Sequence, residues 1–518
     1  MGLRIIRQAS ELDVPFGATP LRNEIVPFQS YQVDAKMPFE VREATVLDMQ
    51  AAMASGQISS AELVTAHMAR IEAFDQKGPC LNAMICLNPN AGEDAVTRDA
   101  ERQRGHVRGP LHGIPVILKD NYTTREMPTT AGSVSLATLQ TTDDAFQVKK
   151  LRDAGAIILG KANMDDLSNG SVSMSSVRGQ TLNPYDLRFV PGGSSGGSAV
   201  SVAASFAPIA FGTDTGISIR LPASANNLFG LRPTKGLSSI TGIVPRSRTH
   251  DTAGPMARNV ADLAIALDAT VGYDPKDPAT RAAPKGLTPR FLASLNTESL
   301  RCAKFGLVKN LHGAVASEVS VIIAAATETL RKAGASTVEL ELPLADSLNE
   351  ATVWNMEFKF DLAEFLAGIP SAPVQCLADI LEGGEYYLPF EEEFRLCETS
   401  LSLDTDTYRT ALAEQVRIRA AVVSKMDELQ VDALVYPITR VGPVEIGKIQ
   451  PGDCNGNLSA VTGLPALAVP AGFSATGLPV GMEWLGRPFA DELLVQLAYG
   501  YEVVARPRRV PSTTPALS

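Results

Sequence analysis

The sequence predicts an α/β fold in which a mixed, largely parallel sheet is covered by helices, and three observations lead to this prediction. Short apolar runs such as residues 113–120 (GIPVILKD) and 156–161 (AIILGK) alternate with segments of helical spacing such as 143–155 (DDAFQVKKLRDAG). The alternation continues to the C-terminal run 464–472 (LPALAVPAG). With 518 residues, the chain can also bury a large core. Strands that alternate with helices are typical of α/β proteins.

The N-terminal part of the chain indicates an arm followed by a helical hairpin. Residues 1–40 are rich in turn-forming residues and show little periodicity, so we expect an arm that lies on the surface. Apolar positions at helical spacing follow over residues 45–56. Ser59 and Glu62 then form a capping-box pattern at the start of a second helix. The sequence therefore predicts a helical hairpin over residues 45–74.

The rest of the chain is expected to form a single domain that spans residues 41–510. Within it, the segment 275–289 is rich in Pro, Lys and Asp and is the best candidate for a connection between two halves. We expect helices near 317–333 and 413–429 in the second half. The last residues, 511–518 (PSTTPALS), are expected to form a frayed tail.

The composition excludes several classes of partner. The net charge is −11 and charged residues make up 20% of the chain, so we expect no basic surface for nucleic acid or anionic lipid. The longest nearly apolar run, residues 199–211, is shorter than the about 20 residues that cross a bilayer. The N-terminus has no sustained apolar segment of the secretory type, so we expect a cytoplasmic protein.

Cysteine and histidine usage argues against a metal site. Six cysteines are scattered along the chain without a CxxC pair, and only five histidines occur. We therefore expect buried, reduced thiols, no metal and no cofactor.

Two glycine-rich segments concentrate hydroxyl groups, residues 192–198 (GGSSGGS) and residues 212–220 (GTDTGISIR). A phosphate-binding loop would require Gly-Lys-Ser/Thr at its end, which the first segment lacks. The first segment also fits the G-x-S-x-G pattern of an α/β-hydrolase nucleophile elbow, at Ser194 and again at Ser195. The question is which side chain would activate such a serine.

The residues that could activate a serine here are two histidines and one lysine. His250 and His312 follow the elbow pattern in the sequence, so an esterase that uses an elbow serine and His250 is one hypothesis. Lys119 ends an apolar strand, where burial could hold it neutral and let it act as the base instead. An ion pair with the adjacent Asp120 is the alternative interpretation of this lysine.

The segments around these residues resemble the amidase signature family. Four segments carry the resemblance: 108–121 (RGPLHGIPVILKDN), 191–199 (PGGSSGGSA), 212–223 (GTDTGISIRLPA) and 251–258 (DTAGPMAR). The resemblance implies the fold of that family and hydrolysis of a carboxamide by a serine–serine–lysine triad. It makes Lys119 the general base, Ser194 the bridging serine after a cis peptide bond, and Ser218 the nucleophile that forms the acyl-enzyme.

The same resemblance assigns roles to neighbouring residues. Four consecutive backbone N–H groups are expected to form the oxyanion hole, those of Thr215, Gly216, Ile217 and Ser218. Three side chains are expected to support the site: Ser195, Asp214 and Arg220. Two residues are expected to contact substrate, Met174 and Ser175. The Ser175-Ser176 pair also fits turn chemistry, and that alternative stays open.

One residue departs from the pattern of the family. Most members have glycine immediately before the nucleophile, where this chain has Ile217. A β-branched residue resists positive φ and places a bulky side chain beside the oxyanion donors. A binding protein of low activity is therefore another hypothesis, and we expect Ile217→Gly to change the substrate range more than the folding.

The substrate is only partly indicated by the sequence. Residues 108–115 (RGPLHGIP) and 179–185 (GQTLNPY) most resemble the peptide-amidase branch, which removes the C-terminal amide of peptides. The amidotransferase A protein of the tRNA-dependent system shares the same core, so a component of that kind is an alternative. The expected partners are a small-molecule or peptide amide substrate and, as an open question, a second copy in a homodimer. Six aromatic residues are expected in the pocket or in the core: Trp354, Phe358, Phe360, Tyr386, Tyr387 and Phe390.

Overall fold

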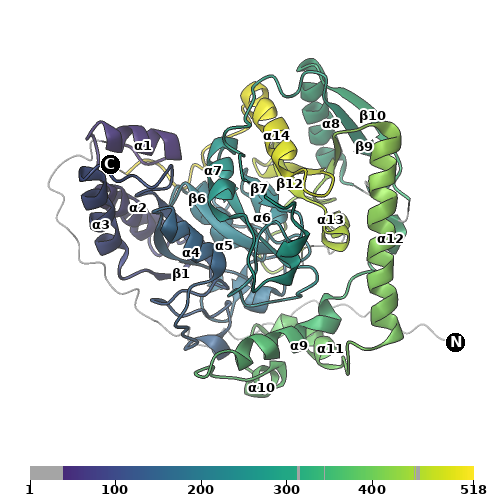
Figure 1. Cartoon of the computed structure of the whole chain (residues 1–518), viewed down its shortest axis with the longest axis horizontal. Helices are drawn as coiled ribbons and strands as arrows, with labels where there is room; N and C mark the ends of the chain where they lie inside the picture. The colour runs from purple at the N-terminus through teal and green to yellow at the C-terminus, as the bar shows by residue number, and fades with distance from the viewer. Residues whose placement is uncertain are drawn as a thin grey trace.

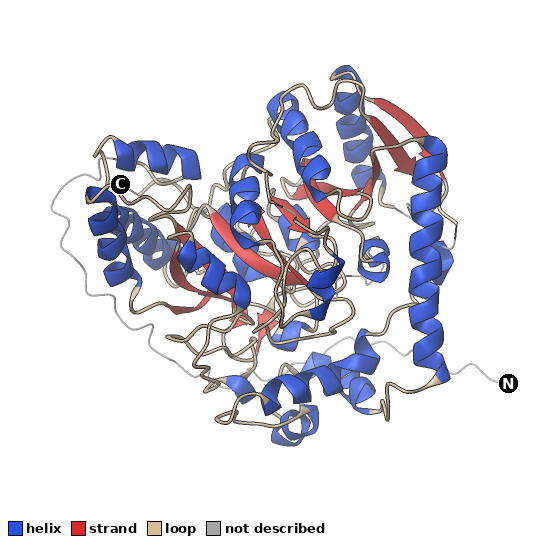
Figure 2. Cartoon of the chain, in the orientation of Figure 1, coloured by secondary structure: helices blue, strands red, loops and turns tan. Residues whose placement is uncertain are grey.

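A computed structural model of the chain describes residues 39–286, 288–311, 315–343, 345–448, 450 and 455–517. These residues form one mixed sheet of 11 strands with helices on both faces, and a separate two-stranded hairpin (Figure 1, Figure 2). The predicted α/β fold is thereby confirmed. Residues 1–38 of the predicted arm, and His312, lie outside the described residues.

The order of the strands across the sheet differs from their order in the sequence. From one edge to the other they are β1 (Met84–Leu87), β3 (Ile157–Ala162), β2 (Pro115–Lys119), β6 (Ile209–Asp214), β8 (Thr252–Ala257), β7 (Phe229–Arg232), β12 (Ala466–Phe473), β13 (Pro479–Leu485), β11 (Ala433–Pro437), β9 (Lys304–Val308) and β10 (Ser336–Leu340). The separate hairpin consists of β4 (Met174–Ser175) and β5 (Gly179–Gln180).

Parallel pairing occurs on both sides of the sheet, and antiparallel pairing fills its middle. Strands β3, β2 and β6 are parallel neighbours, as are β11, β9 and β10. Every pair from β6 through β8, β7, β12 and β13 to β11 is antiparallel. The middle therefore has more antiparallel pairing than the sequence indicated, because short connections such as that between β12 and β13 return the chain beside the preceding strand. Strands from before and after the predicted connection 275–289 belong to this one sheet.

The helices cover the sheet, and some of them begin at a capping residue. In chain order they are α1 (Val46–Ala54), α2 (Ser60–Phe74), α3 (Ala91–Gln103), α4 (Phe146–Asp153), α5 (Gly196–Ala203), α6 (Arg220–Ala225), α7 (Val260–Thr270), α8 (Ser317–Lys332), α9 (Trp354–Ala367), α10 (Leu377–Gly383), α11 (Glu391–Glu398), α12 (Asp406–Leu429), α13 (Asn457–Thr462) and α14 (Asp491–Ala505). Short 3-10 helices lie at Val134–Leu136, Asp166–Ser168, Pro278–Ala282, Ala345–Ser347 and Leu388–Phe390. The predicted hairpin is present as α1 and α2, and each begins with a capping box. None of the described helices is long and apolar enough to cross a bilayer.

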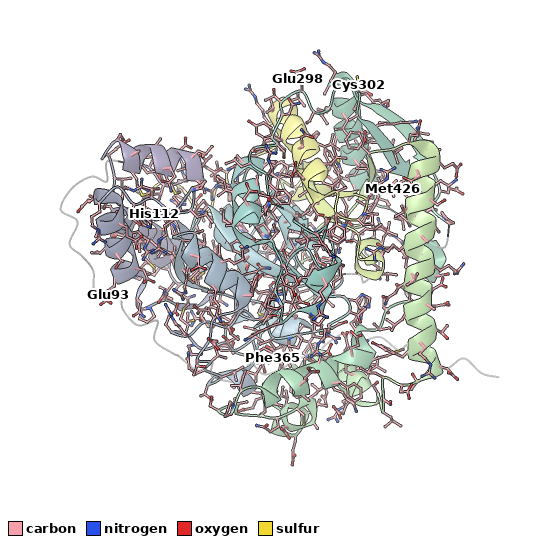
Figure 3. All side chains as sticks on the ribbon, in the orientation of Figure 1. Glu93, His112, Glu298, Cys302, Phe365 and Met426 are labelled. Atoms are coloured by element: carbon pink, nitrogen blue, oxygen red, sulfur yellow. The ribbon has the colours of Figure 1, made fainter. Side chains whose placement is uncertain are left out.

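Alternate residues of each strand divide the core between the two faces of the sheet. In β2, Val116 and Leu118 belong to the hydrophobic cluster that α1, α4, α7, α8 and α14 complete, and Ile117 belongs to the cluster that contains α5 and α6. Met426 belongs to α12, the long helix at the right of Figure 3, and is fully buried in a third cluster. Because side chains alternate along a strand, the side chain of Lys119 points to the same face of the sheet as that of Ile117, which is the face that α5 covers.

Helices α9, α10 and α11 form a lobe (residues 354–398) below the sheet in Figure 1, and this α9–α11 lobe has a core of its own. Phe358 and Tyr386 are buried in that core together with side chains from loops of the main domain, and Phe365 packs against it (Figure 3). Phe358 and Tyr386, two of the six aromatic residues expected in the pocket or the core, therefore belong to the core.

The C-terminal residues pack against the domain, so the prediction of a frayed tail is wrong. The carbonyls of Thr514 and Pro515 accept hydrogen bonds from the buried guanidinium of Arg70 at 3.1 and 3.0 Å. Thr513 Oγ1 donates to the carbonyl of Pro184 at 2.5 Å. Figure 1 accordingly places the C-terminus beside α1. The reason is that Arg70 lies inside the protein and its N–H groups require acceptors there.

Removal of residues 511–518 is expected to lower the midpoint of thermal unfolding. Among the described residues, Arg70 would then keep only the carbonyl of Ala204 as an acceptor, and a buried donor without a partner costs about 1–3 kcal/mol. The matched control is Arg70→Met, which should cost less stability in the shortened chain than in the full chain. Equal costs in both chains would show that the tail does not stabilise the protein through Arg70.

Candidate active site

Lys119, the last residue of β2, is completely buried and faces the turn that precedes α5. Its Nζ lies 2.7 Å from Ser194 Oγ and 2.8 Å from Thr213 Oγ1. The adjacent Asp120 pairs with Lys161, Nζ to Oδ1 3.2 Å, and both side chains are fully buried. Neighbouring side chains of an extended segment point to opposite sides. The interpretation of Lys119 as the ion-pair partner of Asp120 is therefore wrong.

The environment of Lys119 favours its neutral form. Burial lowers the pKa of Lys119 to about 7, although Asp165, Asp251 and Asp214 act in the opposite direction. A neutral amine has two N–H donors and a lone pair, so it can accept the proton of Ser194 while it donates to Thr213. Thr213 Oγ1 also accepts from Asn121 Nδ2 at 3.0 Å.

Sequence reasoning missed Thr213 and Asn121. Each lies within or directly beside a motif described above, since Thr213 belongs to GTDTGISIR and Asn121 follows Lys119 by two residues. Both residues could have been predicted from their positions at the ends of two neighbouring parallel strands, because the ends of such strands meet at one edge of a sheet.

Ser194 and Ser195 lie in a tightly packed turn at the start of α5. The peptide bond between Gly193 and Ser194 is cis, as the resemblance implies. Gly193 has no room for a side chain, because a Cβ there would clash with Oδ2 of Asp165. Ser195 Oγ donates to the carbonyl of Thr213 at 3.1 Å and accepts from the N–H of Thr213 at 3.3 Å. Ser195 thus ties the turn to β6, which supports its predicted role.

The loop between β6 and α6 presents a row of backbone donors. Within the described part of the chain, none of the N–H groups of residues 215–218 donates to a protein acceptor. The carbonyls that precede three of these N–H groups accept hydrogen bonds: that of Asp214 from Arg232, that of Gly216 from Arg220 Nη2 at 2.5 Å, and that of Ile217 from the N–H of Leu221 at 2.9 Å. In a trans peptide the C=O and N–H point in opposite directions. The N–H groups of the residues that follow these carbonyls therefore face away from the held side, as an oxyanion site requires.

A buried ion network fixes this loop from beneath. Arg220 Nε lies 3.0 Å from Oδ2 of Asp214, and its Nη1 lies 2.6 Å from Oε1 of Glu483. Burial alone would raise the pKa of Asp214, but Arg220 and Arg232 hold that pKa below its ordinary value. The network supports the prediction that Asp214 and Arg220 lock the loop.

Ser218 lies at the edge of this row and is only slightly exposed, at 6%. Its carbonyl accepts from the N–H of Ser195 at 3.2 Å. Its hydroxyl makes no hydrogen bond with another described residue. The structure therefore contains the contact between Lys119 and Ser194 but no hydrogen bond between Ser194 and Ser218.

Ile217 fits the loop without backbone strain. Neither Ile217 nor Gly216 has a positive φ, so the conformation that a β-branched residue resists does not occur here. The side chain is buried and packs against Gly456, where a Cβ would lie 2.7 Å from Ile217 Cγ1. Removal of a buried side chain of this size costs about 2–5 kcal/mol. Ile217→Gly is thus expected to weaken folding as well, which the sequence did not show.

His250 does not serve as a base for the elbow serines. Its Nε2 accepts from the N–H of Val353 at 3.1 Å, which leaves Nδ1–H to donate to the carbonyl of Ala460 at 3.0 Å. Burial lowers the pKa of His250 to about 4. Since both ring nitrogens bond to backbone groups, and Ser194 bonds to Lys119, the esterase hypothesis with His250 is wrong.

The predicted substrate contacts lie in the loop beside the cis peptide bond. Ser175 Oγ accepts from the N–H of Arg178 at 3.0 Å and is almost fully buried, so turn chemistry accounts for this serine. Met174 is partly exposed, and its N–H donates to Asp165 Oδ1 at 2.9 Å. Burial raises the pKa of Asp165 to about 7. Within the described ranges, no group of three or more His, Cys, Asp or Glu side chains is placed to hold a metal ion.

Comparison with known proteins settles the family. The Amidase family model matches residues 62–495. The chain belongs to the Amidase family. The solved structure of the native peptide amidase from Stenotrophomonas maltophilia is 39% identical, with a TM-score of 0.86, and the match covers 91% of this chain and 99% of that chain. The predicted resemblance is confirmed, and with it the prediction of an amide-hydrolysing enzyme.

Two further relatives carry another name, that of the A component of glutamyl-tRNA(Gln) amidotransferase. The relative of this name from Deinococcus deserti is 34% identical over 476 residues, which cover 88% of this chain and 96% of that protein. The solved structure of the relative of this name from Thermotoga maritima is 27% identical, with a TM-score of 0.73, and the match covers 92% of this amidase and 100% of that chain.

The pKa of Lys119 leads to a prediction for the pH dependence of serine labelling. Reaction of Ser218 with a fluorophosphonate is expected to rise between pH 6 and 8, with a midpoint near 7, because Lys119 can serve as the predicted base only when it is deprotonated. Peptide mapping by mass spectrometry measures the labelled fraction. Lys119→Arg stays charged and should slow labelling by about 100-fold or more.

Asp165→Asn is the control for that profile, because Asp165 also titrates near pH 7 and the two groups interact. A midpoint that stays near pH 7 in this variant assigns the profile to Lys119. Labelling that is flat from pH 6 to 8 in the unmodified amidase would contradict the neutral-lysine mechanism.

Gly456 and Ile217 are expected to behave as a matched pair. Gly456→Ala places a methyl group against Ile217, and such overpacking typically costs about 1–3 kcal/mol. In an Ile217→Ala background the same change should cost less, because Cγ1 and Cδ1 of Ile217, the two atoms nearest to the new methyl group at 2.7 and 2.8 Å, are then absent. Urea unfolding of the four chains gives the coupling energy, and additive costs would show that the two side chains do not meet.

Proposed function

We propose that this amidase hydrolyses carboxamides through an acyl-enzyme on Ser218, with Ser194 and Lys119 as the proton relay. The observation that carries the proposal is the buried contact between Lys119 and Ser194 beside the row of backbone N–H groups of residues 215–218. Ser218 Oγ attacks the amide carbonyl, its proton passes to Ser194, and the proton of Ser194 passes to neutral Lys119. The N–H groups stabilise the oxyanion that forms, each typically by about 2.7–4 kcal/mol.

The second half of the reaction uses the same groups in reverse. Lys119 returns its proton through Ser194 to the amide nitrogen, the C–N bond breaks, and ammonia or an amine leaves. A water molecule then attacks the acyl-Ser218 ester and gives up a proton to the relay. As the bond between the acyl carbon and Ser218 Oγ breaks, the relay returns this proton to Oγ. The carboxylic product leaves with Ser218 in its starting form, so the proposed cycle balances without a cofactor.

We assign peptide-like and small uncharged carboxamides as the substrate class. The likeness to the Stenotrophomonas peptide amidase, in identity and TM-score, exceeds that to the solved amidotransferase component, which supports this choice. Action as an amidotransferase component within a complex stays the alternative, and it rests on the relatives of that name. The cytoplasmic location and the homodimer stay predictions from the sequence.

Release of ammonia from N-acetylated peptide amides tests this proposal. Ser218→Ala is expected to abolish release, and Ser194→Ala to lower kcat by about 10²–10⁴-fold, because proton transfer contributes about that much. His250→Ala is the control, which should lose stability yet keep labelling of Ser218. Glutamine as the only substrate, or ammonia release that needs a copurified partner, would instead support the amidotransferase alternative.

A further inference from the structure

A tryptophan borders the row of backbone N–H groups. A Cβ built on Gly216 would lie 3.9 Å from Cη2 and from Cζ3 of Trp354, and 4.0 Å from Oδ1 of Asn457. These are ordinary contact distances, so the outer edge of the indole lies directly across from Gly216. Trp354 begins α9 and is only partly buried. The edge of an apolar ring and the oxygen of a carboxamide therefore both lie within contact distance of Gly216, in the middle of the oxyanion row.

The indole is held from the main domain. The carbonyl of Trp354 accepts from Arg246 Nη1 at 3.0 Å, and the preceding N–H, that of Val353, donates to His250 Nε2 at 3.1 Å. The ring of His250 also meets the indole in an edge contact, with 5.1 Å between ring centroids. The position of Trp354 is thus fixed relative to the β6–α6 loop.

The charges near the site favour uncharged substrates. Three carboxyl groups act on Lys119 through their charge: Asp165, Asp251 and Asp214. Asp214 is paired with Arg220 and Arg232, whereas Asp165 and Asp251 have no arginine or lysine in a salt bridge among the described residues. A substrate carboxylate close to Lys119 would be repelled by Asp251 and by the ionised form of Asp165.

We propose that Trp354 is a specificity-determining residue that forms the apolar wall of the subsite next to the scissile carbonyl. The ring selects amides that carry a flat or bulky uncharged side chain beside that carbonyl over glycine-like and anionic amides. An aromatic or aliphatic group gains contact area and ring-edge interactions there, which a hydrogen atom cannot provide. The inference rests on the proposed function, because that function places the carbonyl at residues 215–218.

The chain offers an optical probe for this subsite. It contains two tryptophans, and the other, Trp484, is fully buried between Phe305 and Tyr501. A ligand in the proposed subsite should therefore change the fluorescence of Trp354 and leave that of Trp484 unchanged. The Ser218→Ala variant allows this binding to be followed without turnover.

The test compares N-acetylphenylalanine amide with N-acetylglycine amide. In the Ser218→Ala protein, the aromatic amide should give a saturable fluorescence change, which Trp354→Leu removes. In the active enzyme, Trp354→Leu should lower the ratio of kcat/KM for the aromatic amide to that for the glycine amide by about 10-fold, mainly through KM. The control is Phe360→Leu, an aromatic of the same helix whose ring contacts Lys359, and it should leave the ratio unchanged.

Each result decides a different point. If Trp354→Leu lowers kcat/KM equally for both amides, so that their ratio is unchanged, the proposed subsite is wrong. The proposed function would still stand in that case, provided that ammonia release depends on Ser218. A saturable fluorescence change that requires Trp354, without ammonia release by the active enzyme, would support the subsite and contradict the hydrolysis. Preference for an N-acetylaspartate α-amide over the aromatic amide would also overturn the inference.

Discussion

The burial of the Lys119 amine against two hydroxyl groups is the constraint on which the rest of the site depends. An ammonium ion at this position would be surrounded by apolar strands, and burial brings its pKa from 10.5 to about 7, which corresponds to about 5 kcal/mol against the charged form. The neutral amine has hydrogen-bond partners in this buried position, because Ser194 and Thr213 lie at 2.7 and 2.8 Å. The strand register that brings β2 beside β6, and the turn that precedes α5, both serve to bring these three side chains together.

The loop that follows β6 must stabilise a negative charge, whereas the environment of Lys119 disfavours a positive one. Its N–H groups must point toward a developing negative charge, so its carbonyls must find partners elsewhere. Arg220 and Arg232 supply those partners, and Asp214 and Glu483 neutralise the arginines inside the core. A charged network beneath the loop therefore orients uncharged donors above it. This division explains how a site with a neutral base can still stabilise an anion.

Local patterns allowed much of this arrangement to be predicted. The apolar run before Lys119, the Gly-Ser turn and the capping residues of α1 and α2 are each encoded within a few residues. Contacts between distant segments were not predictable in the same way. Ile217 fits because Gly456 leaves space for it, His250 is tied to Val353 and Ala460, and Arg70 is satisfied by carbonyls at the end of the chain. None of these partners is marked by a motif.

The α9–α11 lobe carries its own small core, yet it sends Trp354 to the edge of the oxyanion row. Chemistry and selectivity are thus encoded in different parts of the chain: the relay in the strands and the glycine-rich turns, the indole at the first residue of a peripheral helix. Substitution of Trp354 can change the subsite without removing a contact of Lys119, Ser194 or the arginine network. Substrate choice can therefore change at this one position while the residues of the relay stay the same.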